Sequence, residues 1–196
     1  MKEIIVYTDY VCPFCLITEP LIREAIKGKE LKITWRPHEL RPFPVPTLKV
    51  EDGYLPSIWQ RAVYPMAKKL GVELTLPTIS PQPRTTKAFE AFAFAETQGL
   101  GDAFSMATLS SFFQKNQDIG ETDVLLNIAQ EIGLDPVRLN KSLASNEFTE
   151  THKRALNKAK QKDKINVVPT IIIGDERFEG VPDRKWLKSA INKLYL

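Results

Sequence analysis

The two cysteines of the chain are the residues whose type and spacing best suit chemistry. The sequence contains only Cys12 and Cys15, which are separated by Pro13 and Phe14. Two intervening residues on the first turn of a helix bring two sulfur atoms within bonding reach. One close pair cannot build the set of bridges that staples small secreted folds. The spacing therefore indicates a dithiol that forms and breaks a disulfide.

The expected elements on either side of the pair explain how one sulfur is activated. Residues 3–8 are β-branched and aromatic and predict a buried strand, whereas residues 16–27 have helical apolar spacing. Cys12 then lies at a helix N-terminus, where unpaired N–H groups and the helix dipole favour a thiolate. Pro13 suits a first helical turn because it has no N–H to lose. We expect Cys12 to attack a substrate disulfide and Cys15, the more buried thiol, to resolve the mixed disulfide.

Two other interpretations of the cysteines are open at this point. Buried cysteines are often inert and serve only to fill a core. A zinc site needs four ligands, and the chain offers the two cysteines together with His38 and His152. Neither histidine has metal-ligand spacing to the other, so we expect no metal and no other cofactor.

Val168 and Pro169 form a second signal, ahead of a strongly β stretch. A proline can start a strand where the ladder needs no N–H. A cis bond here would set the Val168 backbone beside the active site, open to pair with an extended peptide. X-Pro bonds are cis in only about 5–6% of cases, so these residues alone give no warrant for the cis isomer.

Two further titratable residues are candidates for tuning the thiols. His38 would stabilise the Cys12 thiolate if it lies near that end of the sheet, and otherwise is a partly buried loop histidine. Asp9 would assist proton transfer to Cys15, or would only cap the start of the helix.

The remaining pattern predicts one sheet built from both ends of the chain. An alternating strand at residues 31–36 follows the first helix, which implies a parallel pair with a right-handed crossover. A proline-rich loop, a block of helices, a hairpin and a final helix come next. Neither half has enough strands alone, so we expect an α/β fold with an all-helical insertion between a β-α-β part and a β-β-α part. The later elements are expected at residues 58–70, 86–98, 102–115, 122–132, 136–144 and 146–162 (helices), 167–173 and 177–180 (strands) and 182–194 (helix).

Composition limits the domain organisation, the partners and the location. The 196 residues suit one discontinuous domain, residues 1–54 and 165–196, that carries a helical insertion at residues 55–164. The formal net charge of +3 is too small to indicate a nucleic-acid partner. No apolar run reaches the roughly 18 residues of a membrane span, and the N-terminal stretch is no signal peptide. We therefore expect a cytoplasmic protein with no membrane partner.

Taken in order, these motifs resemble the DsbA-like branch of the thioredoxin superfamily, and within it the FrnE-like group. The resemblance covers essentially the whole chain. It rests on the Cys-Pro-Phe-Cys motif at residues 12–15, on Pro20, on Trp35 through Pro42, on residues 118–120 and 132–135, and on Val168-Pro169-Thr170.

The resemblance implies a thioredoxin-like fold with a large helical insertion, Cys12 as nucleophile and Cys15 as resolving thiol. It also implies a cis Pro169 that contacts substrate together with Val168. Phe14 departs from the pattern, because DsbA has a histidine and the FrnE-like group often a tryptophan at this place. A histidine can stabilise a thiolate and a phenylalanine cannot, so we expect a less oxidising couple than that of DsbA.

The function we expect is disulfide exchange with protein or low-molecular-weight thiols, with a second redox partner that recycles the pair. The fold also resembles kappa-class glutathione transferases and 2-hydroxychromene-2-carboxylate isomerases, but these typically keep a serine at the first cysteine position and have no second cysteine. A peptide-binding chaperone without catalysis is the other alternative. Its apolar groove would use residues that suit the core of the insertion better, namely Phe89, Phe92, Phe94, Phe112 and Phe113. A cytoplasmic location favours a reductase, an isomerase or a thiol-repair protein over a net oxidase.

Overall fold

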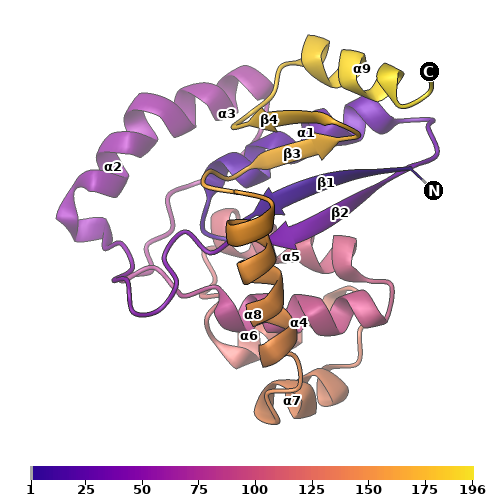
Figure 1. The fold of residues 1–196 in the computed structure, drawn as a ribbon. Coiled ribbons are helices and arrows are strands. Elements are labelled where there is room, and N and C mark those ends of the chain that lie inside the picture. The colour runs from indigo at the N-terminus through magenta and orange to yellow at the C-terminus, as the bar shows by residue number, and fades with distance from the viewer. Residues whose placement is uncertain (1) are drawn as a thin grey trace.

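A four-stranded sheet joins the two ends of the chain (Figure 1). The computed structural model describes residues 2–196. The strands are β1 (Lys2–Thr8), β2 (Leu31–Pro37), β3 (Thr170–Ile173) and β4 (Glu176–Glu179). Their order is β2-β1-β3-β4, with β1 and β2 parallel and the other neighbours antiparallel. The expected α/β, thioredoxin-like fold is confirmed.

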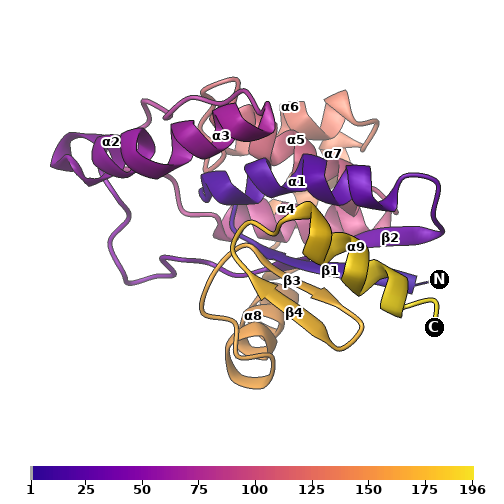
Figure 2. The same ribbon diagram turned by 90° about the horizontal axis from the view of Figure 1, so that it is seen from above.

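The central strand β1 pairs with a strand on each side, β2 and β3. Ile4 is fully buried and pairs with Ile33 on one side and with Ile173 on the other. The parallel β1–β2 pair needs a crossover, which helix α1 (Pro13–Ile26) supplies. Helix α1 packs along α9 (Arg184–Lys193), and Figure 2 shows the two side by side. A short loop connects the carboxyl end of β1 to α1, so α1 begins beside that end of the strand.

The helical insertion lies between β2 and β3 and packs on the β2 edge through α5 and α8 (Figure 1). Its aromatic residues Phe89, Phe92, Phe94, Phe112 and Phe113 are all buried, and they belong to one core shared with the sheet, since Phe89 stacks on Tyr10. The domain boundaries expected at 54/55 and 164/165 stay a prediction. The helices are α2 (Tyr54–Ile58), α3 (Tyr64–Leu70), α4 (Thr86–Thr97), α5 (Gly101–Phe113), α6 (Thr122–Glu131), α7 (Pro136–Ala144) and α8 (Thr149–Asn157), with a 3-10 turn at Val50–Asp52 and π turns at Trp59–Val63 and Lys158–Lys162.

Several boundaries differ from the sequence-based expectation for identifiable reasons. The strand expected from residue 167 begins only at Thr170, because Pro169 has no N–H to donate to the ladder. The helix expected from residue 146 begins at Thr149, since Asn146 has a positive φ of 55° that no helix contains. The helix expected from residue 58 starts earlier, at Tyr54, and continues through a π turn.

The helices of residues 2–196 are all too short or too polar to span a bilayer.

Candidate functional site

Cys12 occupies the N-cap position of α1, as its spacing from Cys15 predicted. Its φ and ψ of −96° and 110° are extended, and Pro13 takes the first helical position. The Cys12 amide donates to the Asp9 carbonyl at 3.0 Å, and the Cys15 amide donates to the Cys12 carbonyl at 3.1 Å. Both thiols are free. The turn therefore holds the two side chains about one helical turn apart at the positive end of the helix.

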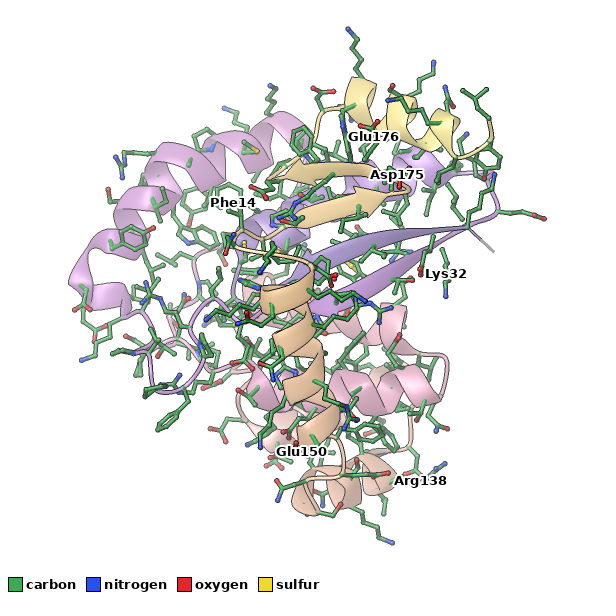
Figure 3. All side chains as sticks on the ribbon, in the orientation of Figure 1. Phe14, Lys32, Arg138, Glu150, Asp175 and Glu176 are labelled. Atoms are coloured by element: carbon green, nitrogen blue, oxygen red, sulfur yellow. The ribbon has the colours of Figure 1, made fainter. Side chains whose placement is uncertain are left out.

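The segment that precedes β3 packs against this turn. The Cys12 thiol donates to the Val168 carbonyl oxygen at 3.5 Å, although the two residues are 156 positions apart. The Val168-Pro169 peptide bond is cis. Phe14, half-buried, points from the start of α1 toward the side of α2 (Figure 3). The structure thus brings together all four residues of the motif and both residues of the second signal.

Cys15 is the more enclosed of the two thiols, 1% exposed against 5% for Cys12. Burial raises the pKa of the Cys15 thiol well above its usual value, and the adjacent Cys12 side chain raises it further. The Thr8 hydroxyl and the Asp9 backbone act in the opposite direction without offsetting these effects. Cys15 therefore needs a base before it can act as a nucleophile.

Asp9 begins the cysteine turn, where its carbonyl accepts from the Cys12 amide, and it is 1% exposed. The Leu40 amide donates to Asp9 Oδ2 at 2.7 Å, while Oδ1 has no hydrogen-bond partner within residues 2–196. Burial raises the pKa of Asp9 to about 6, and the charge of Glu39 raises it too. The hydrogen bond from Leu40 and the hydroxyl of Thr85 limit this rise. A carboxylate with one free oxygen and a pKa near 6 is suited to accept a proton at neutral pH.

His38 lies directly after β2, beside the end of β1, and its role in tuning the thiols stays a prediction. Its amide donates to the Thr8 carbonyl at 2.9 Å and so extends the pairing of β2 with β1. Burial and the charge of Lys160 lower the pKa of its half-buried imidazole, and Glu39 opposes them. His38 is outside the lining of the cavity beside Cys12, whereas Asp9 belongs to it.

A cavity of about 250 Å³ opens beside the Cys12 thiol and the Val168 backbone. One wall consists of the start of α1 together with the π turn of the insertion. Another wall is the loop after β2. Short π segments are frequent at functional sites. Its polar side chains are few, among them Asp9, Arg41 and Gln82. The apolar lining comes mainly from Phe14, Leu48, Leu55, Ile58, Trp59 and Val63.

Sequence reasoning missed one buried pair next to this site. His152 Nε2 of α8 lies 2.6 Å from Glu39 Oε1, and the two side chains are 2% and 3% exposed. Glu39 directly precedes Leu40, whose amide holds Asp9. A polar loop residue and a polar helix residue 113 positions apart give no local signal of such a contact. Elsewhere, residues 2–196 contain no group of three or more His, Cys, Asp or Glu side chains that could hold a metal ion.

Comparisons with known proteins agree with this architecture. Residues 3–192 match the family model described as the DSBA-like thioredoxin domain. The uncharacterized protein YwbO of Bacillus subtilis (strain 168) is 40% identical over 188 residues, which are 95% of this chain and 94% of that protein.

Solved structures match over the full length at lower identity. A 2-hydroxychromene-2-carboxylate isomerase has a TM-score of 0.79 at 18% identity and covers 98% of this chain and 96% of its own. The cytosolic disulfide reductase DsbM from Pseudomonas aeruginosa with GSH has a TM-score of 0.71 at 15% identity and covers 99% of this chain and 100% of its own. At these identities the likeness concerns the fold.

Proposed function

Because the chain belongs to the family of DSBA-like thioredoxin domains, we propose that it is a thiol–disulfide oxidoreductase whose reacting pair is Cys12 and Cys15. One observation carries the proposal. The Cys12 thiol lies at the N-cap of α1, 3.5 Å from the Val168 carbonyl, with Cys15 on the same turn. Both thiols are free, and Cys12 lines an apolar cavity that gives a substrate access to its sulfur.

The reaction uses the two sulfurs in sequence. The Cys12 thiolate attacks one sulfur of a substrate disulfide, so that a mixed disulfide forms and the other sulfur leaves as a thiolate. The Cys15 thiolate then attacks the Cys12 sulfur. An intramolecular disulfide forms, the second substrate sulfur leaves, and the substrate has gained two electrons. A recycling partner with a dithiol of lower potential returns the pair to its reduced form.

Asp9 supplies the base for the second step in this proposal. Burial holds Cys15 in its thiol form, as its raised pKa indicates. Asp9 is ionised above a pH of about 6 and has a free oxygen, Oδ1. Transfer of the Cys15 proton toward this carboxylate generates the attacking thiolate without exposing the site to water.

The substrate class we favour is a low-molecular-weight thiol or its disulfide, with exposed protein disulfides as the wider class. The cavity of about 250 Å³ suits a small organic group next to the reacting sulfur. DsbM, a structural neighbour, is described as a cytosolic disulfide reductase with GSH. We accordingly propose a cytoplasmic reductase or isomerase that exchanges with glutathione-type thiols.

The test is the equilibrium reduction potential of the Cys12–Cys15 pair, measured by thiol trapping across a series of glutathione redox buffers. Formation of an intramolecular disulfide with a potential near the thioredoxin value, about −270 mV, supports a reductase. A value near that of DsbA, about −120 mV, retains the oxidoreductase but reverses the direction. Failure of the pair to form any intramolecular disulfide refutes the proposal.

A further inference from the structure

The buried contact between Glu39 and His152 ties the loop after β2 to helix α8. The atoms Oε1 and Nε2 are 2.6 Å apart, and neither side chain is more than 3% exposed. Burial of a carboxylate costs free energy unless the group is paired, and the contact with His152 supplies that pairing for Glu39. His152 Nδ1 has no hydrogen-bond partner within residues 2–196, so the imidazole is anchored only through Glu39 and its stacking.

Two routes connect this pair to the cysteine turn. Along the backbone, Glu39 is followed by Leu40, whose amide donates to Asp9 Oδ2 at 2.7 Å. Through the core, the His152 ring stacks on Phe89 with centroids 5.5 Å apart. Phe89 in turn stacks at 4.4 Å on Tyr10, the residue after Asp9. The contacts form a closed ring around the base of the active-site turn.

We propose that Glu39 and His152 are positioning residues of the dithiol centre: their contact fixes the loop after β2 so that the Leu40 amide holds the Asp9 carboxylate in place for Cys15. This inference rests on the proposed function of the Cys12–Cys15 pair. It assigns neither residue a contact with substrate, and it predicts that the second step of exchange depends on the pair more than the first.

The charged and polar groups around Asp9 determine the pH at which its carboxyl group ionises. The charge of Glu39 raises the pKa of Asp9, whereas the Leu40 amide and the Thr85 hydroxyl lower it. Cys12 and Arg41 line the same cavity as Asp9. Replacing Glu39 by glutamine keeps a hydrogen-bond acceptor for His152 and removes the negative charge. The ionisation of Asp9 in Glu39→Gln should therefore move to lower pH.

The experiment follows the reduced full-length protein as it reacts with the chromogenic disulfide of thionitrobenzoate. Attack by Cys12 releases one coloured thiolate, and attack by Cys15 releases the second as the intramolecular disulfide forms. The ratio of the two rates isolates the resolving step within one trace. We expect Glu39→Gln to retain this ratio at pH 8 and to shift the pH midpoint of the second phase downward.

Removal of the whole contact gives the complementary variant. In Glu39→Met with His152→Leu, no buried charge is left unpaired, a kind of replacement that is often neutral for stability. The second phase should slow about tenfold relative to the first, since small displacements of a catalytic group are costly. Glu150→Gln is the matched control, because Glu150 is an exposed carboxylate on the same helix (Figure 3).

The outcomes separate this inference from the proposed function. Release of only one thiolate by the wild-type protein refutes the dithiol function itself. Release of two, with the double variant folded by circular dichroism and its rate ratio unchanged, refutes the positioning role alone. If the double variant does not fold, the milder variant His152→Asn, whose shorter side chain breaks the contact with Glu39, decides, and an unchanged rate ratio in it overturns the inference.

Discussion

The Cys12 thiol donates a hydrogen bond to the Val168 carbonyl oxygen at 3.5 Å, so the two ends of the chain meet at one sulfur. Cys12 belongs to the turn between β1 and α1, and Val168 belongs to the segment that leads into β3. Because β1 and β3 are antiparallel neighbours, the carboxyl end of one strand lies beside the start of the other. The sheet topology therefore creates the site, and each chemical step can be tested by changing one residue in it.

Replacing the resolving thiol should trap the reaction at its intermediate. In Cys15→Ser, attack by Cys12 on glutathione disulfide leaves a mixed disulfide that nothing inside the protein can resolve. Intact mass spectrometry should detect the glutathione adduct as the main species, whereas the wild-type protein should pass to the intramolecular disulfide. Cys12→Ser is the control and should acquire no adduct. Full exchange activity in Cys15→Ser would instead favour a glutathione-dependent transferase or isomerase.

A positive charge at position 14 should make the Cys12–Cys15 pair more oxidising. Phe14 lies on the first turn of α1 and lines the cavity beside Cys12, and it has no charge to offer a thiolate. In Phe14→His, a protonated imidazole stabilises the Cys12 thiolate of the reduced form by about 1 kcal/mol. The reduction potential should rise by roughly 20 mV on that scale.

The pH dependence of this shift distinguishes charge from packing. The increase in potential should be larger at pH 6, where an imidazole is mostly protonated, than at pH 8. The neutral variant Phe14→Gln should change the potential little at either pH. An equal shift for both variants would attribute the effect to lost packing.

Filling the cavity should discriminate between substrates by size. Ile58 is half-buried and lines the cavity of about 250 Å³ where α2 passes into the π turn. In Ile58→Trp, the larger ring occupies space that a bulky substrate group needs. We expect KM for an aromatic disulfide to rise severalfold, with little change for hydroxyethyl disulfide. Val137→Trp, at an exposed position of α7, is the control and should change neither value.

Local patterns in the sequence were sufficient to predict the centre of the site. The spacing of Cys12 and Cys15, the strand before them and the helix after them are all contained in one short stretch. The parallel β1–β2 pair follows from the same stretch, because a strand, a helix and a strand in sequence favour that crossover. Periodicity likewise predicted the helices of the insertion, with errors at their ends.

Contacts between distant segments could not be predicted in this way. Aspartate is mostly exposed in proteins, so nothing in the sequence indicated that Asp9 would be 1% exposed and held by the Leu40 amide. His152 appeared only as a poor zinc ligand, because its partner Glu39 lies 113 residues away. These relationships depend on how the insertion packs against the sheet, which is a tertiary property.

The buried carboxyl of Asp9 should make the protein less stable as the pH rises from 4 to 6. Its pKa is raised from 3.8 to about 6 in the folded state. Between these values the folded protein binds a proton that the unfolded chain has already lost, so the free energy of unfolding decreases with increasing pH and levels off above the folded pKa. A difference of about two pKa units corresponds to roughly 3 kcal/mol.

Removing this charge should therefore stabilise the protein at neutral pH while impairing its reaction. In Asp9→Asn the amide oxygen still accepts from the Leu40 amide, and no charge is buried. Urea denaturation should give a free energy of unfolding about 1–3 kcal/mol higher than wild type at pH 7 and nearly equal at pH 4. The resolving attack by Cys15 should slow about a hundredfold at pH 7, because the proton acceptor is gone. A variant that is less stable than wild type at both pH values, with an unchanged resolving rate, would show that the carboxyl acts only through packing.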